Sequence, residues 1–199
     1  MDTHPEPGSG KPPLTVRTGT TLVVVDDDPY VLWTTALMET QARISSIALL
    51  HETLYQSANH ARVQLADYLR KVATRLFRAQ VDAAGAVRLV LELAAVEVAT
   101  EQAIPCGLLM NELMTNAIKH AFPENRGGEV RVEIQALADG PGWRLRVADN
   151  GVGLPPDFDM DNPSSLGLKL VTNLTRQLGG RLTIGTGPGA VLEVECRTG

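Results

Sequence analysis

The chain contains little cysteine. Its 199 residues include two cysteines, Cys106 and Cys196, and neither has a CxxC partner or a histidine at metal-ligand spacing. This pattern excludes a zinc site of the cysteine-histidine type and a disulfide framework. We expect both thiols to be small, buried, apolar side chains.

Long apolar runs and an excess of positive charge are also missing. Every apolar stretch is interrupted by charge well short of the roughly 20 residues that span a bilayer. The first twenty residues hold no apolar segment of the signal-peptide type. We therefore expect a cytoplasmic protein without a membrane contact. With 18 Lys and Arg against 23 Asp and Glu, the net charge is −5, which disfavours a nucleic-acid partner because phosphate neutralisation needs clustered cations.

The composition, 44% hydrophobic and 21% charged, is that of an ordinary globular chain of one or two domains. Residues 1–20 are polar and rich in proline and glycine, and we expect a flexible leader. Residues 21–78 begin with a short strand pattern and continue as two amphipathic helices with apolar side chains along one stripe. This part is expected to form the antiparallel helices of a partial dimerisation bundle, and hence a homodimer.

The pattern changes near residue 79. Residues 87–93 alternate as a strand does, and Pro105 is expected to open a long helix that runs to Ala121. A β-hairpin over 129–148 follows, then a long loop over 149–166, a helix over 166–178 and two closing strands. Residues 79–199 therefore predict an α+β fold, a two-layer α/β sandwich.

Polar side chains follow one face of the helix over 105–121. Successive residues turn by about 100° in a helix, so Glu112, Asn116 and Lys119 fall within roughly one 60° sector. A carboxylate, an amide and an ammonium in register can coordinate Mg²⁺ through oxygen and neutralise phosphate. A solvated polar face is the other interpretation of this pattern.

Two glycine-containing segments follow. Asp149-Asn-Gly-Val-Gly153 ends a predicted strand, where its glycines let the backbone approach a flat ligand and its carboxylate can accept a hydrogen bond from an exocyclic amine. A plain turn is the alternative. Ser165-Leu-Gly-Leu-Lys169 opens the next helix, whose free backbone N–H groups favour an anion.

The order of these segments resembles the Bergerat ATP-binding domain of sensor histidine kinases, over residues 86–197. Leu109 to Ala121 resembles the N box, Asp149 to Gly153 the first glycine box, and Ser165 to Leu168 the second, with the ATP lid between the last two. The segments Ala36 to Ser57 and Arg62 to Arg70 resemble the second dimerisation helix of the kinase subfamily with the alternative dimerisation and phosphoacceptor domain, close to the HWE kinases. Gln102 to Gly107 and Lys119 to Pro123 also resemble that subfamily.

The resemblance implies a role for each matching residue. Asn116 would bind the Mg²⁺ that bridges the ATP phosphates, and Glu112 would act beside it as a base or orienting group. The resemblance also implies supporting roles. Asn111 would support the same site, Lys119 and His120 would reach the phosphates, and Asp149 would bind the adenine amine. Gly151 and Gly153 would shape the pocket, and Gly167 and Leu168 would lie beside the phosphates. The implied activity is transfer of the γ-phosphoryl group of ATP to a histidine, for relay to the receiver domain of a response regulator.

The sequence does not identify the histidine that would accept the phosphoryl group. The subfamily carries it on a first helix upstream of Ala36, where this chain has only His4 in the leader. His51-Glu52 resembles the acceptor dipeptide of ordinary kinases but falls on the second helix in the subfamily pattern. The alternative function is therefore a degenerate kinase, or a nucleotide-binding regulatory module of the anti-sigma type, without self-phosphorylation.

Two further segments depart from the family pattern. Leu22 to Pro29 resembles the first strand and acidic pocket of a receiver, but the rest of a receiver does not follow. A linker or replacement segment is the preferred interpretation over a Mg²⁺ site at Asp26 and Asp27. Gly189-Ala190 stands where many relatives have Gly-Thr, which removes a hydroxyl near the expected adenine position.

Overall fold

The computed structural model describes residues 15–18, 21–24, 62–81, 87–156, 158–160 and 165–197, together with the helical positions Ile44 and Ala48. The chain divides into two units, residues 1–41 and 42–199. In the first unit, β1 (Thr15–Thr18) pairs with β2 (Thr21–Val24) as an antiparallel hairpin. The candidate positions His4, Asp26, Asp27 and His51, and most of the expected dimerisation helix, lie outside the described residues.

The second unit is built on a five-stranded sheet of order β4-β6-β7-β9-β8. Its strands are β4 (Val87–Leu93), β6 (Gly128–Ala136), β7 (Gly142–Asp149), β8 (Gly180–Ile184) and β9 (Val191–Arg197). β4 runs parallel to β6, and the other neighbours are antiparallel. The hairpin of β6 and β7 was expected from the sequence, and so was the closing pair β8 and β9.

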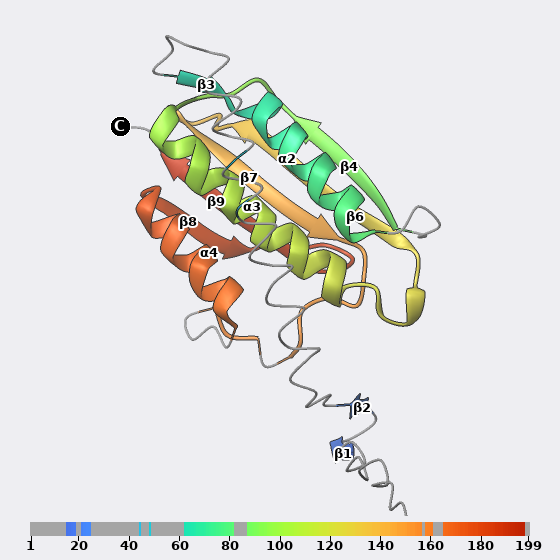
Figure 1. Cartoon of the computed structure of the whole chain (residues 1–199). Helices are drawn as coiled ribbons and strands as arrows, with labels where there is room; N and C mark the ends of the chain where they lie inside the picture. The colour runs from blue at the N-terminus through green and yellow to red at the C-terminus, as the bar shows by residue number, and fades with distance from the viewer. Residues whose placement is uncertain are drawn as a thin grey trace, which may run out of the picture. The chain divides into compact units, whose positions relative to one another are not determined.

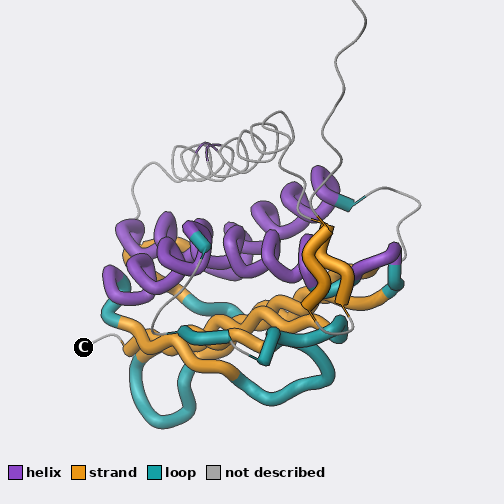
Figure 2. Tube along the Cα trace, turned by 90° about the horizontal axis from the view of Figure 1, so that it is seen from below, coloured by secondary structure: helices purple, strands orange, loops and turns teal. Residues whose placement is uncertain are grey.

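Helices cover one face of this sheet. They are α2 (Leu65–Gln80), α3 (Thr100–His120) and α4 (Leu166–Gln177), and they form a layer beside the strands (Figures 1 and 2). A 3₁₀ turn, η1 (Pro123–Asn125), follows α3, and a small sheet pairs β3 (Arg62–Gln64) with β5 (Glu97–Ala99). The expected two-layer α/β sandwich is confirmed.

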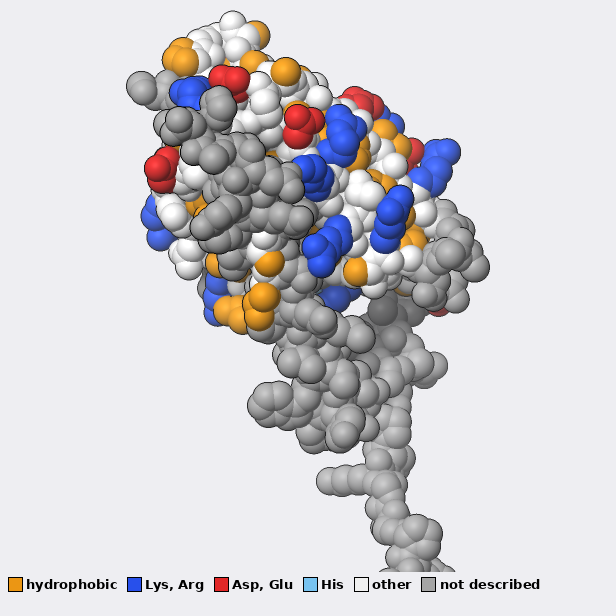
Figure 3. Space-filling view, turned by 45° about the horizontal axis from the view of Figure 1, so that its top comes forward, with side chains coloured by type: hydrophobic (Ala, Val, Ile, Leu, Met, Phe, Trp, Pro, Cys, Tyr) orange, Lys and Arg blue, Asp and Glu red, His pale blue; other side chains and the backbone are white. Residues whose placement is uncertain are grey.

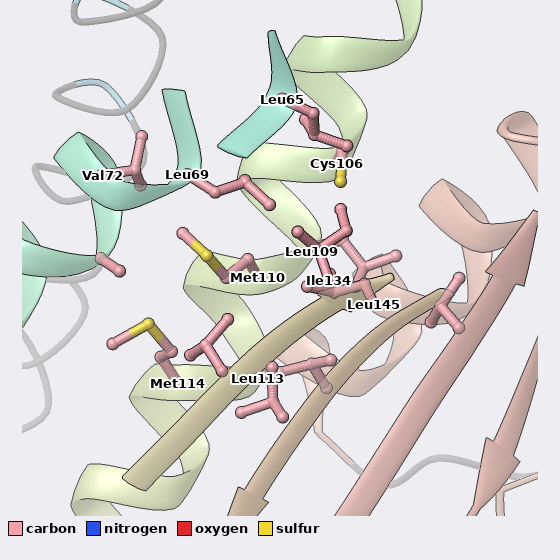
Figure 4. Packing of buried hydrophobic residues seen from close by; sticks show 14 of the residues in the cluster. Leu65, Leu69, Val72, Cys106, Leu109, Met110, Leu113, Met114, Ile134 and Leu145 are labelled. Atoms are coloured by element: carbon pink, nitrogen blue, oxygen red, sulfur yellow. The ribbon is translucent and has the colours of Figure 1, made fainter. Parts of the chain in front are cut away.

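The core lies between α3 and the sheet. Leu109 and Leu113 of α3 are buried with Ile134 of β6 and Leu145 of β7 (Figure 4). The core also contains both cysteines as free thiols. Burial raises the pKa of the Cys196 thiol to about 12, with a smaller contribution from Glu195, and burial raises that of Cys106 well above its usual value. The thiols are therefore unreactive apolar side chains, as expected.

The opposite face of the sheet carries pairs of arginine and glutamate. Arg146 of β7 contacts Glu133 of β6 and Glu193 of β9, and Arg144 lies 3.3 Å from Glu195. Because every second residue of a strand points to the same side, these charges alternate with the core residues. These cross-strand ion pairs neutralise charge on this face of the sheet.

α2 packs on the same core as α3 and the sheet. The pattern placed it in the helical domain of residues 21–78, with a boundary near 79. In the structure, its apolar face, including Leu69 and Val72, belongs to the same core as α3 and the sheet. Its other face exposes Arg70, Lys71, Arg75 and Arg78, and Figure 3 shows Lys and Arg side chains gathered on this side of the molecule. Periodicity identified the buried face of α2 but not what covers it.

α3 also begins earlier than expected. The sequence placed its start at Pro105, but the helix begins at Thr100 and Pro105 lies inside it. Proline lacks an N–H and therefore cannot donate to the carbonyl of Glu101, four residues earlier. Because Pro105 lies beyond the first turn, where proline removes no hydrogen bond, α3 lacks this one bond. The three-residue strands β3 and β5 were not expected, since such short segments carry no measurable period.

A tight contact between α2 and α3 gives a prediction for stability. A methyl group at Gly107 would lie 2.2 Å from the hydroxyl oxygen of buried Tyr68. Overpacking of this kind costs roughly 1–3 kcal/mol, so Gly107→Ala should lower the free energy of unfolding in urea despite alanine's better helix propensity. In the double variant with Tyr68→Leu, the loss should be smaller than the sum of the two single losses. Additive losses would show that the two positions do not clash.

Candidate functional site

The polar face of α3 meets the start of α4. Glu112 is 5% exposed and Asn116 is half-buried. A Cβ atom on Gly167 of α4 would lie 2.9 Å from Oε2 of Glu112 and 3.9 Å from Oδ1 of Asn116. The structure therefore brings Glu112, Asn116 and Gly167 together, although the N box and the second glycine box are separated by two strands and a long loop.

Asp149 is the last residue of β7 and is 6% exposed. Its Oδ1 atom accepts hydrogen bonds from the backbone N–H of Gly151 at 2.9 Å and of Ala190 at 3.1 Å. Both of these bonds end on the same oxygen. The carboxylate is thus fixed through Oδ1, and Oδ2 is its second hydrogen-bond acceptor.

The glycines of the first glycine box allow close approach of backbone. A Cβ atom on Gly151 would lie 2.0 Å from the carbonyl oxygen of Ala121, just after α3. Gly153 has φ of +80°, a conformation that non-glycine residues rarely adopt. Gly151 is therefore required by a contact, and Gly153 by its backbone conformation.

The start of α4 is capped by the protein itself. Ser165 is the N-cap, and its hydroxyl accepts a hydrogen bond from the N–H of Leu168 at 3.2 Å. The sequence suggested that several free N–H groups would face an anion here. In the structure the Leu168 N–H is occupied, so the amides of Leu166 and Gly167 are the better placed donors at this helix start.

The remaining predicted residues fall in two places. Lys119 and His120 are exposed in the last turn of α3, each with a polar interaction inside the protein. Asn111 is 2% exposed, and its Oδ1 has no hydrogen-bond partner among the described residues. It lies one turn after Gly107, on the side of α3 that meets α2, about 100° around the helix from Glu112. The structure does not group Asn111 with Glu112 and Asn116.

The sequence did not identify the backbone of residues 189–190 as part of the site. The Ala190 N–H binds Asp149, and a Cβ atom on Gly189 would lie 2.3 Å from Oδ1 of Asp149. In the sequence, Ala190 differs from the family pattern by its missing hydroxyl group, and this is the only signal at that position. Its N–H contributes whatever side chain it carries, and a backbone contact between residues 41 positions apart leaves no signal in a single sequence.

The contact at Gly167 gives a prediction for ligand binding. Gly167→Ala would place a methyl group against the Glu112 carboxylate, at 2.9 Å from Oε2, in the space between α3 and α4. We expect ATP affinity, measured by competition with a fluorescent nucleotide, to fall by about tenfold, equivalent to ~1.4 kcal/mol. Leu170→Ala, one turn further along α4 on a half-buried position, is the control for general damage to the helix. Equal losses in the two variants would contradict the prediction.

Comparison with known proteins places this site in a family. Residues 101–198 match the model of the "Histidine kinase-, DNA gyrase B-, and HSP90-like ATPase" family, and residues 27–80 match a second model described as "Histidine kinase". The chain belongs to the histidine kinase family. The second match lies in the segment that resembled the alternative dimerisation and phosphoacceptor domain.

Curated histidine kinases are similar over most of this chain. Blue-light-activated histidine kinase 2 of Erythrobacter litoralis is 29% identical over 158 residues, which are 77% of this chain and 45% of the relative. Sensor histidine kinase PdtaS of Mycobacterium tuberculosis is 32% identical over 140 residues, 70% of this chain and 27% of the relative. The chain thus spans less than half the length of these two histidine kinases.

The solved structures agree with the fold. The histidine kinase domain of the blue-light-activated kinase of Erythrobacter litoralis superposes with a TM-score of 0.72 at 28% identity, covering 79% of this chain and 74% of that domain. Among the described residues of this chain, no helix is both long and apolar enough to cross a membrane.

Proposed function

We propose that this chain is the catalytic core of a sensor histidine kinase in a two-component system. It would bind Mg-ATP in the cytoplasm and transfer the γ-phosphoryl group to a histidine, which would pass it to an aspartate on a response regulator. The observation that carries the proposal is the approach of Gly167 to Glu112 and Asn116, together with the fixed carboxylate of Asp149 at the end of β7. The family membership and the named relatives support it.

The adenine end of the nucleotide fits Asp149. An adenine presents an exocyclic amine, which is a hydrogen-bond donor, and a carboxylate oxygen is an acceptor. Two backbone N–H groups already orient Oδ1 of Asp149, so the carboxylate pays little conformational entropy when a ligand binds. Gly151 lets the backbone after Asp149 lie against Ala121, and Gly153 supplies the positive φ that follows it.

The phosphate end fits the polar face of α3. The Asn116 carboxamide would supply an oxygen ligand of the kind that Mg²⁺ prefers, and Mg²⁺ is usually held by one or two protein groups together with phosphates. When bound, the ion would neutralise charge on the phosphoryl oxygens. Glu112 would hold the nucleophile or its proton, while Lys119 and His120 would steer the phosphates from the end of α3.

The transfer itself requires a histidine nitrogen in line with the γ-phosphorus. The nitrogen forms the new P–N bond, the bond to the β-phosphate oxygen breaks, and ADP leaves. Of the two helices expected to form a homodimer, the first lies almost entirely outside the described residues and the second is α2. Among the described residues, the structure shows neither an acceptor histidine nor a second copy of the chain. The acceptor and the dimer are therefore part of this proposal.

The test is incubation of the purified chain with Mg-ATP labelled at the γ-phosphate. A kinase that contains its own acceptor gives acid-labile, base-stable label on the protein. Loss of that label in His51→Ala and its persistence in His4→Ala would assign the acceptor to His51. Bound ATP without label, also after addition of a peptide that carries the acceptor helix of a relative, would favour a nucleotide-binding regulatory module.

A further inference from the structure

Three chain segments meet at the end of α3. They are Ala121 and Phe122, which follow the helix, Gly128 and Glu129, which begin β6, and the loop 150–152, which follows Asp149. In Figure 1, the end of α3 lies at the same end of the molecule as η1 and the adjoining ends of β6 and β7. Each segment contacts the other two.

The first contact joins α3 to the loop. The carbonyl oxygen of Ala121 accepts a hydrogen bond from the N–H of Val152 at 3.0 Å. A Cβ atom on Gly151 would lie 2.0 Å from the same carbonyl oxygen, which is too close for any side chain. The helix that carries Asn116 and the loop that carries Gly151 are therefore held together by backbone.

The second contact joins α3 to β6. A Cβ atom on Gly128 would lie 2.1 Å from the ring of Phe122 and 2.7 Å from Oδ1 of Asn150. Gly128 is thus pressed between an aromatic ring from the end of α3 and a side chain from the loop. A side chain at position 128 would push these two groups apart.

The third contact joins the loop to β6 through one side chain. Oδ1 of Asn150 accepts a hydrogen bond from the N–H of Glu129 at 2.7 Å, and the Asn150 N–H donates to the carbonyl of Glu129 at 3.3 Å. These bonds form a ring that extends the pairing of β6 and β7 by one residue beyond Val130 and Asp149. Asn150 is exposed, so its side chain is not needed to fill the core.

From this geometry we propose that Asn150 is a positioning residue of the nucleotide site, an inference that rests on the proposed function. Asn150 stands between Asp149 and Gly151, the residue whose N–H orients Oδ1 of Asp149. Fixing Asn150 on β6 fixes both neighbours, and thus the direction in which Asp149 presents its second oxygen. The contacts described for the Asn150 side chain are with Glu129 and Gly128 of β6, so we expect it to act on the adenine end and not on the phosphate end.

The test measures binding of the adenine end and of the phosphate end of the nucleotide separately. Affinities for ATP, for adenosine and for Mg-tripolyphosphate are measured by competition with a fluorescent nucleotide, for the full chain and Asn150→Ala. We expect ATP and adenosine to bind about fivefold more weakly, the middle of the range for one hydrogen bond, while tripolyphosphate binding changes less than twofold. Asn150→Asp keeps an acceptor oxygen and should restore most of the adenosine affinity.

Two further variants complete the test. Asn173→Ala, at an exposed position of α4, should leave all three affinities unchanged. Gly128→Ala, which presses on the Asn150 side chain from the opposite strand, should repeat the selective loss of adenosine. Equal losses for adenosine and tripolyphosphate in Asn150→Ala, or no loss of either, would overturn the proposal. Failure of the unchanged chain to bind ATP would instead overturn the proposed function.

Discussion

Replacing Asp149 with asparagine should weaken ATP binding by about 100-fold, or ~2–3 kcal/mol, while the fold survives. Asparagine has the same shape, and its carbonyl oxygen can still accept the N–H groups of Gly151 and Ala190. Its amide nitrogen must then occupy the position of the second carboxylate oxygen. A donor would face the donor amine of adenine, and reversing the amide would instead sacrifice both backbone bonds.

Isothermal titration with ATP measures this change, and thermal unfolding without nucleotide checks the fold. Asp139→Asn makes the same chemical change at an exposed residue that pairs with Arg197 at 2.7 Å, and it should bind ATP as the unchanged chain does. If Asp149→Asn retained affinity within about threefold, or ~0.7 kcal/mol, the assignment of Asp149 to the adenine end would be wrong.

The second large effect is expected at Asn116. Asn116→Ala removes the oxygen ligand proposed for Mg²⁺, so the gain in ATP affinity on adding Mg²⁺ should disappear. Phosphoryl transfer should fall by at least about 100-fold, the usual loss when one group that stabilises developing charge is removed. The variant should fold normally because Asn116 is only half-buried.

Two measurements test the role of Asn116. The first compares ATP affinity in Mg²⁺ with that in EDTA, and the second is the rate of γ-phosphoryl labelling. Asn116→Asp retains an oxygen ligand and should keep a dependence on Mg²⁺, whereas Asn116→Ala should not. If the ATP affinity of the alanine variant still rises with Mg²⁺ as in the unchanged chain, other residues bind the ion.

The sequence predicted the large elements and the identity of the site motifs. The alternation over residues 87–93 and the apolar face of the helix over 105–121 both reflect burial, which is why they correspond to β4 and most of α3. The boundaries were less accurate. A proline is usually found at a helix start, but α3 begins at Thr100 and includes Pro105 in spite of the hydrogen bond that proline removes.

Asn111 shows why a motif does not place every side chain. Adjacent residues on a helix point about 100° apart, so Asn111 and Glu112 cannot serve the same ligand simply because they are neighbours in the N box. Glu112 faces Gly167 of α4, and Asn111 lies on the side of Gly107, toward Tyr68 of α2. Only the positions of α2 and α4 around α3 distinguish these two sides.

By itself, the sequence determined that this chain has a two-layer α/β domain with three motifs in histidine kinase order, because residue type and period depend on local conformation and burial. The tertiary structure decided which atoms meet. It placed Gly167 against Glu112, the Ala190 N–H on Asp149, and Asn150 on the backbone of Glu129. These contacts join residues far apart in the chain, largely through backbone groups that every residue carries, so no pattern in one sequence could indicate them.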